Sequence, residues 1–344
     1  MPPVAVSCRK NKIELQFAYD DKIITAVKTL PGRKWDPEKR LWIVPLDYPN
    51  WLSLKTLFPG TLSLSATALA QDLRYHLAER NYSKKTIRSY CRHIQSFFTF
   101  CNLQPDDVTD TDIHRYLHEK VESGLSNASI RQIYQALIYF FSHLYPKLFV
   151  VKLSLPKKER RLPEILSERE VLTIVEKPAH PKHKLLLKLA YSSGLRVSEL
   201  VSLKWQDIDL DRGLLRIRQG KGKKDRVSIL SKKMEVWIRD YKESNLYIEE
   251  NDYLFPGQLG QKHLHIRTAQ KIFEMAVLKS GIQKKVSIHS LRHAFATHML
   301  EQGTDIRYIQ FLLGHKNLKT TQIYTHVART SIMNLTSPFD KIEF

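Results

Sequence analysis

Hydrophobic residues recur at three- and four-residue steps through the second quarter of the chain, which is the periodicity of amphipathic helices. Four such segments follow one another: 67–79, 87–101 behind a cap at Ser83, 113–121 after Thr109, and 130–144 before a stop at Pro146. The spacing predicts a helical module over residues 63–150.

Residues 1–62 follow a different pattern, in which β-like runs at 13–17 and 41–44 alternate with short helical stretches. This predicts a small α+β module. It holds Trp35, Trp42 and Trp51, and a turn-rich basic loop at 31–40. Two interpretations stay open: the tryptophans fill a small core, or the module is an accessory that contacts DNA.

Residues 151–162 have no helical period and carry Pro156 within a run of cations, so we interpret them as a basic linker. Residues 163–344 are mostly helical, and Ser167 opens the first helix with a capping-box spacing. Two alternating runs, 214–219 and 225–230, flank Gly220-Lys221-Gly222 and predict a β-hairpin with a cationic tip. The fold class is therefore mostly α with a small β-hairpin or sheet.

Composition indicates a class of partner. Lys and Arg number 55 against 35 Asp and Glu, which gives a net charge of +20 and attracts polyanions such as nucleic acid. Hydrophobic residues make up 42%, a globular proportion, and no apolar run is long enough to cross a membrane. Three cysteines form no disulfide framework and no thiolate zinc motif, so we expect a reducing, cytoplasmic compartment.

Cations concentrate in three places where they suit phosphate contacts. The DNA-binding candidates are Lys84, Lys85, Arg88, Arg92 and Arg131 in the helical module, Lys157 and Lys158 in the linker, and Lys223 and Lys224 at the hairpin tip. The ordinary alternative is a solvated basic face. The net charge of the whole chain favours contact with DNA.

Four segments of residues 163–344 concentrate side chains suited to a single reaction. They are 193–200 with Arg196 and Glu199, the hairpin tip with Lys221, 289–293 with His289 and Arg292, and 313–324 with His315 and Tyr324. Each has an ordinary explanation alone, such as a helical ion pair or a solvated turn. Together their order and flanking residues resemble the tyrosine recombinase (phage integrase) family over roughly residues 65–330. Within that family the phrases are most similar to Xer-type and integron-type enzymes.

The resemblance implies a catalytic set: Arg196, Lys221, His289, Arg292, His315 and Tyr324. Guanidinium groups offer paired donors to the non-bridging oxygens of a phosphodiester under attack. Tyr324 is then the nucleophile, and because a phenol has an ordinary pKa near 10, His289 is expected to assist it. Lys221 is expected to protonate the leaving 5′-oxygen, and Glu199 to support Arg196.

The resemblance also implies an architecture in which a core-binding domain at 63–150 and a catalytic domain at 163–344 clamp duplex DNA at an inverted-repeat core site. Four protomers assemble, and the tail at 327–344 docks onto a neighbour or packs onto its own domain. The accessory module at 1–62 favours a mobile-element integrase with arm-type contacts. Dimer resolution, topoisomerase-like relaxation and a catalytically silent regulator remain alternatives.

No cofactor is expected. His289 and His293 are four residues apart, but no Glu follows the first and no third ligand is evident, so we predict no metal site. Gly220-Lys221-Gly222 lacks the rest of a nucleotide-binding loop.

Overall fold

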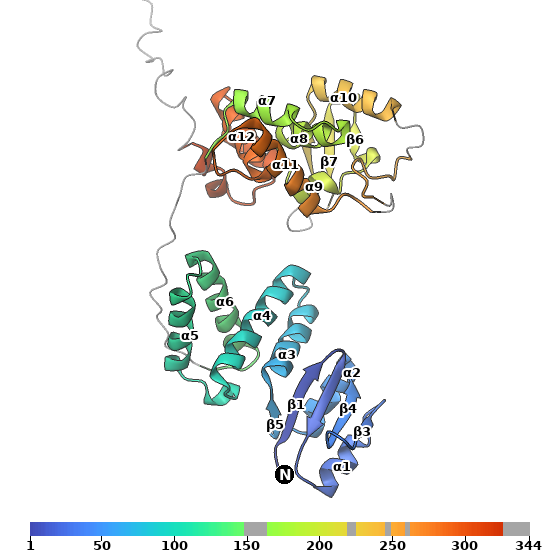
Figure 1. Cartoon of the computed structure of the whole chain (residues 1–344), viewed down its shortest axis with the longest axis vertical. Helices are drawn as coiled ribbons and strands as arrows, with labels where there is room; N and C mark the ends of the chain where they lie inside the picture. The colour runs from blue at the N-terminus through green and yellow to red at the C-terminus, as the bar shows by residue number, and fades with distance from the viewer. Residues whose placement is uncertain (148–163, 219–224, 245–248, 259–261, 326–344) are drawn as a thin grey trace, which may run out of the picture. The chain divides into compact units, whose positions relative to one another are not determined.

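The computed structural model describes residues 1–147, 164–218, 225–244, 249–258 and 262–325 (Figure 1). The chain forms two compact units, Met1–Glu159 and Arg160–Phe344, each with its own hydrophobic core. Within the described ranges, every helix is too short or too polar to span a bilayer.

A five-stranded sheet opens the first unit. Its strands lie in the order β3 (Lys34–Asp36), β4 (Leu41–Pro45), β2 (Lys12–Gln16), β1 (Val4–Arg9), β5 (Leu62–Leu64). β1 and β5 are parallel, and the other three pairings are antiparallel. Alternate residues of β1 and β2 are buried, because successive strand side chains point to opposite faces. α1 (Asp21–Val27) and α2 (Tyr48–Leu57) contribute to the same core, so the predicted α+β module is confirmed.

The three tryptophans of this sheet region divide between the two interpretations. Trp51 on α2 is 3% exposed and belongs to the core. Trp35 lies on the edge strand β3 and is 49% exposed, and its ring contacts that of Trp42, which is half-buried. Core filling therefore explains Trp51 but leaves Trp35 available for an external contact.

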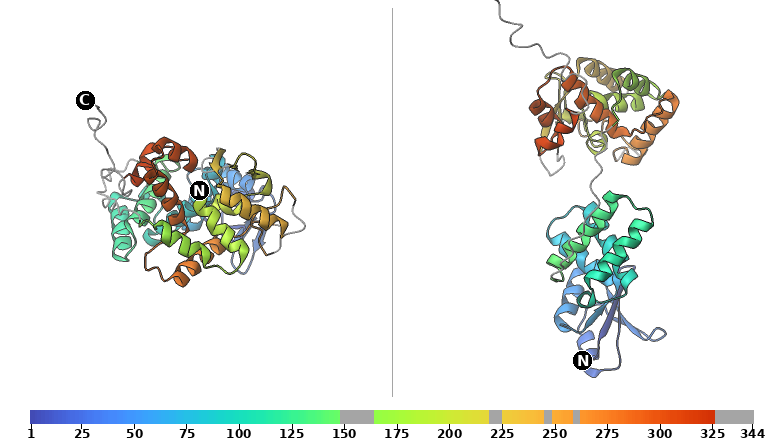
Figure 2. Two further views of the ribbon diagram at one scale, coloured as in Figure 1. Left: turned by 90° about the horizontal axis from the view of Figure 1, so that it is seen from above. Right: turned by 90° about the vertical axis from the view of Figure 1, so that its left-hand side faces the viewer.

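Four helices follow, as the hydrophobic periodicity predicts: α3 (Ala66–Glu79), α4 (Lys84–Cys101), α5 (Asp110–Glu122) and α6 (Asn127–His143). Ser65, Ser83, Thr109 and Ser126 cap their N-termini with side-chain hydrogen bonds. Figure 2 shows these helices gathered at one end of the sheet. A short 3-10 turn, Pro105–Asp107, joins α4 to α5.

The sheet and the four helices share one core, without an intervening linker. β5 ends at Leu64 and α3 begins at Ala66, so the chain passes directly from one to the other. Buried residues of both belong to a single cluster that runs from Val4 to Phe141. The sequence boundary that we placed at residue 62 therefore lies inside one compact unit.

The second unit is mostly helical and includes a small three-stranded sheet. Its helices are α7 (Glu168–Glu176), α8 (Pro181–Ser192), α9 (Val197–Val201), α10 (Lys232–Glu243), α11 (Ile266–Ser280), α12 (Ile288–Glu301) and α13 (Ile306–Leu313), with 3-10 turns at Trp205–Asp207, Leu318–Thr320 and Gln322–Tyr324. The capping box at Ser167 is present. α12 is the central helix, since it is buried on most sides and packs against α7, α8, α11 and α13.

The predicted hairpin is present, although its tip lies outside the described residues. β7 (Leu214–Ile217) pairs antiparallel with β8 (Arg226–Ile229), and β6 (Ile208–Asp209) pairs with β7 as a third strand. β6 has only two residues, so the sequence shows no alternation that would predict it. β8 contacts α13, so the hairpin lies beside the end of that helix.

Candidate active site

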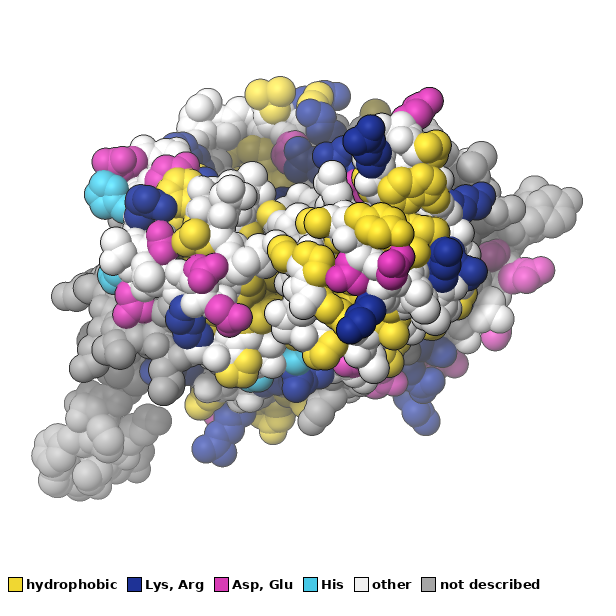
Figure 3. All heavy atoms as spheres, turned by 90° about the horizontal axis from the view of Figure 1, so that it is seen from below, with side chains coloured by type: hydrophobic (Ala, Val, Ile, Leu, Met, Phe, Trp, Pro, Cys, Tyr) yellow, Lys and Arg dark blue, Asp and Glu magenta, His cyan; other side chains and the backbone are white. Residues whose placement is uncertain are grey.

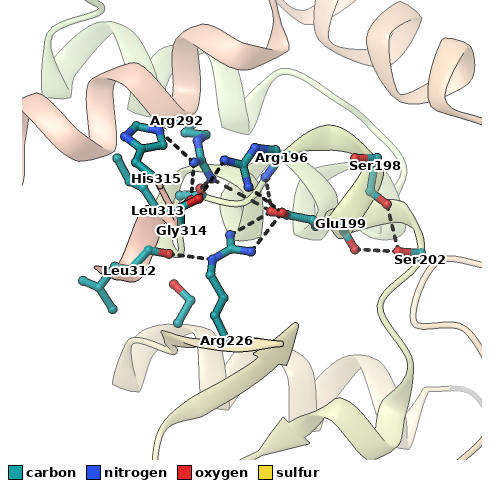
Figure 4. Close-up of polar contacts among 12 residues, drawn as sticks. Arg196, Ser198, Glu199, Ser202, Arg226, Arg292, Leu312, Leu313, Gly314 and His315 are labelled. Carbon is teal, nitrogen blue, oxygen red and sulfur yellow. Dashed lines mark hydrogen bonds and ion pairs between the residues drawn. The ribbon is translucent and has the colours of Figure 1, made fainter. Parts of the chain in front are cut away.

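Glu199 lies at the centre of a cluster of arginines in the second unit (Figure 4). Arg196 is the N-cap of α9; its backbone N–H donates to one carboxylate oxygen of Glu199 at 2.9 Å and its Nη1 donates to the other at 2.8 Å. Arg226 on β8 donates to both oxygens, at 2.9 and 2.8 Å. Nη1 of Arg292 lies 3.9 Å from the same carboxylate. One carboxylate therefore holds three guanidinium groups together.

Glu199 stays ionised in this setting. Burial by itself would raise the pKa of Glu199, but the hydrogen bonds and charge of Arg226 and the bonds from Arg196 outweigh it and lower that pKa to about 2. Burial lowers the pKa of Arg292 to about 9, so its guanidinium is charged at neutral pH. Three positive charges and one negative charge thus leave the cluster at +2, which suits an anionic ligand.

The three arginines also bind consecutive carbonyl groups at the C-terminus of α13. Nε of Arg226 donates to the carbonyl of Leu312 at 3.0 Å, Nη2 of Arg292 to that of Leu313 at 2.5 Å, and Nη2 of Arg196 to that of Gly314 at 3.3 Å. The last carbonyls of a helix lack partners within it and carry partial negative charge. The end of α13 therefore positions all three guanidinium groups.

Two glycines make these close approaches possible. Gly194 has φ +59° and accepts a 2.6 Å hydrogen bond from Nη1 of Arg292; a Cβ at this position would lie 2.4 Å from the ring of Phe295. Gly314, with φ +60°, ends α13, and a Cβ there would lie 2.7 Å from Cδ of Arg226. Both positions need the left-handed conformation that glycine adopts readily.

The hydrogen bonds of His315 fix its protonation. Its Nε2 lies 3.2 Å from Nη2 of Arg292, and its Nδ1 lies 3.0 Å from Oγ1 of Thr321. A guanidinium can only donate, so Nε2 accepts and the proton of the neutral ring lies on Nδ1. Burial, and then the charges of Arg292 and Arg196, lower the pKa of His315 to about 4, which agrees with a neutral imidazole.

Tyr324 comes close to this cluster from the 3-10 turn that follows α13. Its side chain is 1% exposed, and its hydroxyl lies 3.0 Å from Nδ1 of His293 on α12. Burial raises the pKa of Tyr324, while the charges of Arg292 and Arg196 act in the opposite direction. Burial also lowers the pKa of His293, so its neutral ring can accept a hydrogen bond from the phenol.

The structure thus brings together Arg196, Glu199, Arg292, His315 and Tyr324, all predicted from the sequence. It adds Arg226 and His293, to which sequence reasoning gave no role. His289 lies on the exposed side of α12; partial burial and then the charges of Arg292 and Arg196 lower its pKa. The remaining candidates Lys221, Lys157, Lys158, Lys223 and Lys224, and the tail at 327–344, lie outside the described residues.

The DNA-binding candidates of the first unit lie on two helices. Lys84, Lys85, Arg88 and Arg92 are exposed on α4, and Arg131 is half-buried on α6. Figure 3 looks at the chain from below, where hydrophobic side chains gather near the middle of the face, with basic and acidic side chains at several places around them. The basic side chains of the face drawn in Figure 3 are thus interspersed with acidic and hydrophobic ones.

The described residues hold no group of three or more His, Cys, Asp and Glu side chains arranged to bind a metal ion. The site instead offers fixed guanidinium donors, imidazoles and a phenol. Such a set can bind the oxygens of a phosphodiester and present an oxygen nucleophile to it.

Comparison with known proteins agrees with this chemistry. The model of the Phage integrase family matches residues 162–331, and that of the Phage integrase N-terminal SAM-like domain matches residues 69–148. A putative integrase/recombinase of Sinorhizobium fredii, y4qK, is 38% identical over 288 residues, which is 83% of this chain and 92% of the relative. Tyrosine recombinase XerC of Thermodesulfovibrio yellowstonii is 34% identical over 281 residues, 76% of this chain and 91% of the relative.

Solved structures show the same fold. The XerH site-specific recombinase bound to its palindromic difH substrate, in a post-cleavage complex, has a TM-score of 0.62 and 25% identity, with 76% of this chain and 82% of that chain covered. The Tn1549 transposon integrase in complex with transposon right end DNA also has a TM-score of 0.62, at 17% identity, with 79% and 96% covered. From the matched family models, the identity to relatives that are covered over about nine-tenths of their length, and the arginine cluster, the chain belongs to the phage integrase family and is a tyrosine recombinase.

Proposed function

We propose that this chain cuts and rejoins duplex DNA at a specific site through a 3′-phosphotyrosine intermediate at Tyr324. The observation that carries the proposal is the arginine cluster, in which three guanidinium groups and His315 lie together with a tyrosine from a separate segment. A net positive, largely buried cluster beside a phenol favours phosphoryl transfer over simple binding.

The reaction exchanges one phosphodiester for another. The oxygen of Tyr324 attacks the scissile phosphorus, the new O–P bond forms, and the bond from phosphorus to the 5′-oxygen breaks. The phenol proton passes to His293, whose Nδ1 lies 3.0 Å from the hydroxyl in the buried position that Tyr324 leaves. Lys221 gives a proton to the leaving 5′-oxygen. A 5′-hydroxyl of the partner strand then reverses these steps, so the energy of the broken bond is kept and the reaction needs neither ATP nor a metal ion.

Arg196 and Arg292 bind the non-bridging oxygens, where negative charge develops. The bonds to Glu199 and to the carbonyl groups of α13 hold both guanidinium groups before DNA arrives, which avoids a cost of reorganisation during the reaction. Arg226 binds both oxygens of Glu199 and acts as a positioning residue. His289 assists the reaction at the exposed edge of the site. His315 donates to a phosphate oxygen once that phosphate replaces its bond to Arg292 and its Nε2 takes up a proton.

Tyr324 needs a change of position before it can react. At 1% exposure its hydroxyl is inaccessible to a phosphodiester, although the Nδ1 contact keeps it oriented. The 3-10 turns at Leu318–Thr320 and Gln322–Tyr324 carry it, and they are short segments with few hydrogen bonds to other elements. We infer that DNA binding moves this segment toward the scissile phosphate.

The substrate we propose is an inverted-repeat core site, on which four copies of the chain bind two duplexes and exchange their C-terminal tails. Lys84, Lys85, Arg88, Arg92 and Arg131 contact the phosphate backbone. DNA is supported by the solved complexes of the XerH recombinase and the Tn1549 integrase. The additional module at residues 1–62 supports integration and excision of a mobile element. Resolution of chromosome or plasmid dimers is the second candidate, supported by relatives named XerC and XerD.

Covalent capture tests the proposal. The wild-type chain and the Tyr324→Phe variant are expressed in cells beside host DNA. The cells are lysed under denaturing conditions, the protein is purified, and any DNA attached to it is sequenced. We expect reads that cluster at a short inverted repeat with the wild type and no reads with the variant. Scattered reads would indicate topoisomerase-like relaxation, and no reads from either chain would indicate a catalytically silent DNA-binding regulator.

A further inference from the structure

A polar groove lies where the N-terminal sheet meets the four-helix module. It has a volume of about 480 Å³, and we call it the junction groove. The lining residues are Cys8, Arg9, Lys10, Asn11 and Leu46 from the sheet module, Thr67, Ala70, Gln71 and Arg74 from α3, and Cys91 and Gln95 from α4. Both modules belong to the same compact unit, so this groove has a defined shape.

The charged side chains that line the junction groove are all positive. Arg9, Lys10 and Arg74 are exposed, and no Asp or Glu is among the lining residues. Burial raises the pKa of Cys8 to about 12 and that of Cys91 to about 11, so neither thiol adds negative charge. Asn11 and two glutamines supply neutral donors and acceptors. Cations with polar amides and no carboxylate are the composition of a phosphate-binding surface.

The two walls of the groove are held in fixed positions. The backbone N–H of Cys8 on β1 donates to Oγ1 of Thr67 on α3 at 3.1 Å. Asp72 on α3 is 4% exposed and accepts hydrogen bonds from Trp51 at 2.7 Å and Lys55 at 3.0 Å, both on α2, and from Tyr145 at 2.9 Å. A buried carboxylate with three donors resists separation of the modules, because any donor lost would leave it unsatisfied.

The groove continues onto the basic face of α4. Cys91, Arg92 and Gln95 lie three, four and seven residues after Arg88, so all four share one side of that helix. Arg88 and Arg92 are exposed and were predicted to contact DNA. A backbone strand that follows α4 can therefore pass into the groove between Arg9 and Arg74.

We propose that the junction groove binds the phosphodiester backbone of duplex DNA beside the core site. Residues 1–62 then form a fixed extension of the core-binding surface instead of a tethered module that reaches a separate arm-type site. This inference rests on the proposed function, because it takes the duplex that α4 contacts as the ligand. It assigns Arg9, Lys10 and Arg74 to a site outside the arginine cluster that carries the chemistry.

The test compares two variants with equal net charge. Arg9→Gln/Arg74→Gln removes one exposed cation from each wall of the groove. Lys22→Gln/Lys28→Gln, the matched control, removes two exposed cations at α1, outside the groove. Binding of a labelled duplex of arbitrary sequence, several helical turns long, is measured by anisotropy over a series of KCl concentrations. Circular dichroism and thermal unfolding establish that both variants fold.

Two lost phosphate contacts reduce the slope of log K against log salt by about 1.8, and weaken binding roughly 60-fold near ~0.1 M salt. We expect both changes in the groove variant and neither in the control. Equal affinities and slopes for the two variants would overturn the inference. Covalent attachment of DNA through Tyr324 is measured in parallel with the wild-type chain. If the wild type attaches to DNA but the two variants bind the duplex equally, only the groove as a DNA-binding site is refuted. If the wild type does not attach to DNA, the proposed function is refuted.

Discussion

Replacing Glu199 by Gln tests the organisation of the arginine cluster. The carboxylate is 8% exposed and accepts hydrogen bonds from Arg196 and Arg226, with Arg292 at 3.9 Å. Glu199→Gln keeps the volume but leaves three guanidinium groups without a counter-charge. Breaking a buried ion pair by removing one partner costs about 3–5 kcal/mol, so we expect a loss of that order in the free energy of unfolding.

The lowered pKa of Glu199 gives a second, independent value for the stability that its ionised carboxylate contributes. A shift from 4.5 to about 2 corresponds to roughly 3 kcal/mol of stability at neutral pH. Because this pKa is lowered in the folded state, that stability is present above pH 4.5 and is lost as the pH falls toward 2. The difference between wild type and Glu199→Gln should therefore shrink by about 1 kcal/mol between pH 7 and pH 4.

Urea unfolding of both chains at several pH values measures this difference. Glu243→Gln, which changes an exposed carboxylate at the end of α10, is the matched control and should alter stability by less than about 0.5 kcal/mol. A Glu199→Gln chain that is as stable as the control at pH 7, or a difference that does not change with pH, would refute the idea that this carboxylate holds the cluster.

Two further predictions concern the same region. Gly194→Ala should lower the free energy of unfolding by about 2–4 kcal/mol, because the residue has φ +59° and the added Cβ clashes with the ring of Phe295. Gly281→Ala, at φ +74° with open space around it, should lower the free energy of unfolding by only about 1 kcal/mol. Equal losses for the two variants in urea unfolding would show that the clash with Phe295 has no effect. The pKa of His315 is lowered to about 4, so the wild type should lose up to about 2 kcal/mol of stability between pH 7 and pH 5, where the unfolded chain binds the proton. Unfolding of His315→Gln should lack that loss, and an identical pH profile would exclude His315 as its source.

Local spacing was enough to predict part of the site. Arg196 and Glu199 are three residues apart, and the structure shows their ion pair, although Arg196 caps the helix and does not lie within it. The four helices of the first unit were predictable because each has a clear hydrophobic period behind a Ser or Thr cap. These features depend on neighbours along the chain.

The rest depends on contacts between distant segments. Arg226 is 27 residues from Glu199, and nothing in the alternation of its strand shows that a carboxylate and the end of α13 meet there. His289 and His293 are both on α12, and only the position of the turn at Gln322–Tyr324 decides that His293 faces the phenol. The shared core of the N-terminal modules had a weak signal, since no Pro, Gly or charged stretch separates Leu62 from Ala66.

Peptide mass spectrometry of the captured complex locates the covalent bond to DNA, which we place on Tyr324. The complex is digested with nuclease and protease, and the peptide that retains a nucleotide is sequenced. We expect a nucleotide on Tyr324 and on no other residue. A nucleotide on another side chain, such as the exposed Tyr308 on α13, would contradict it.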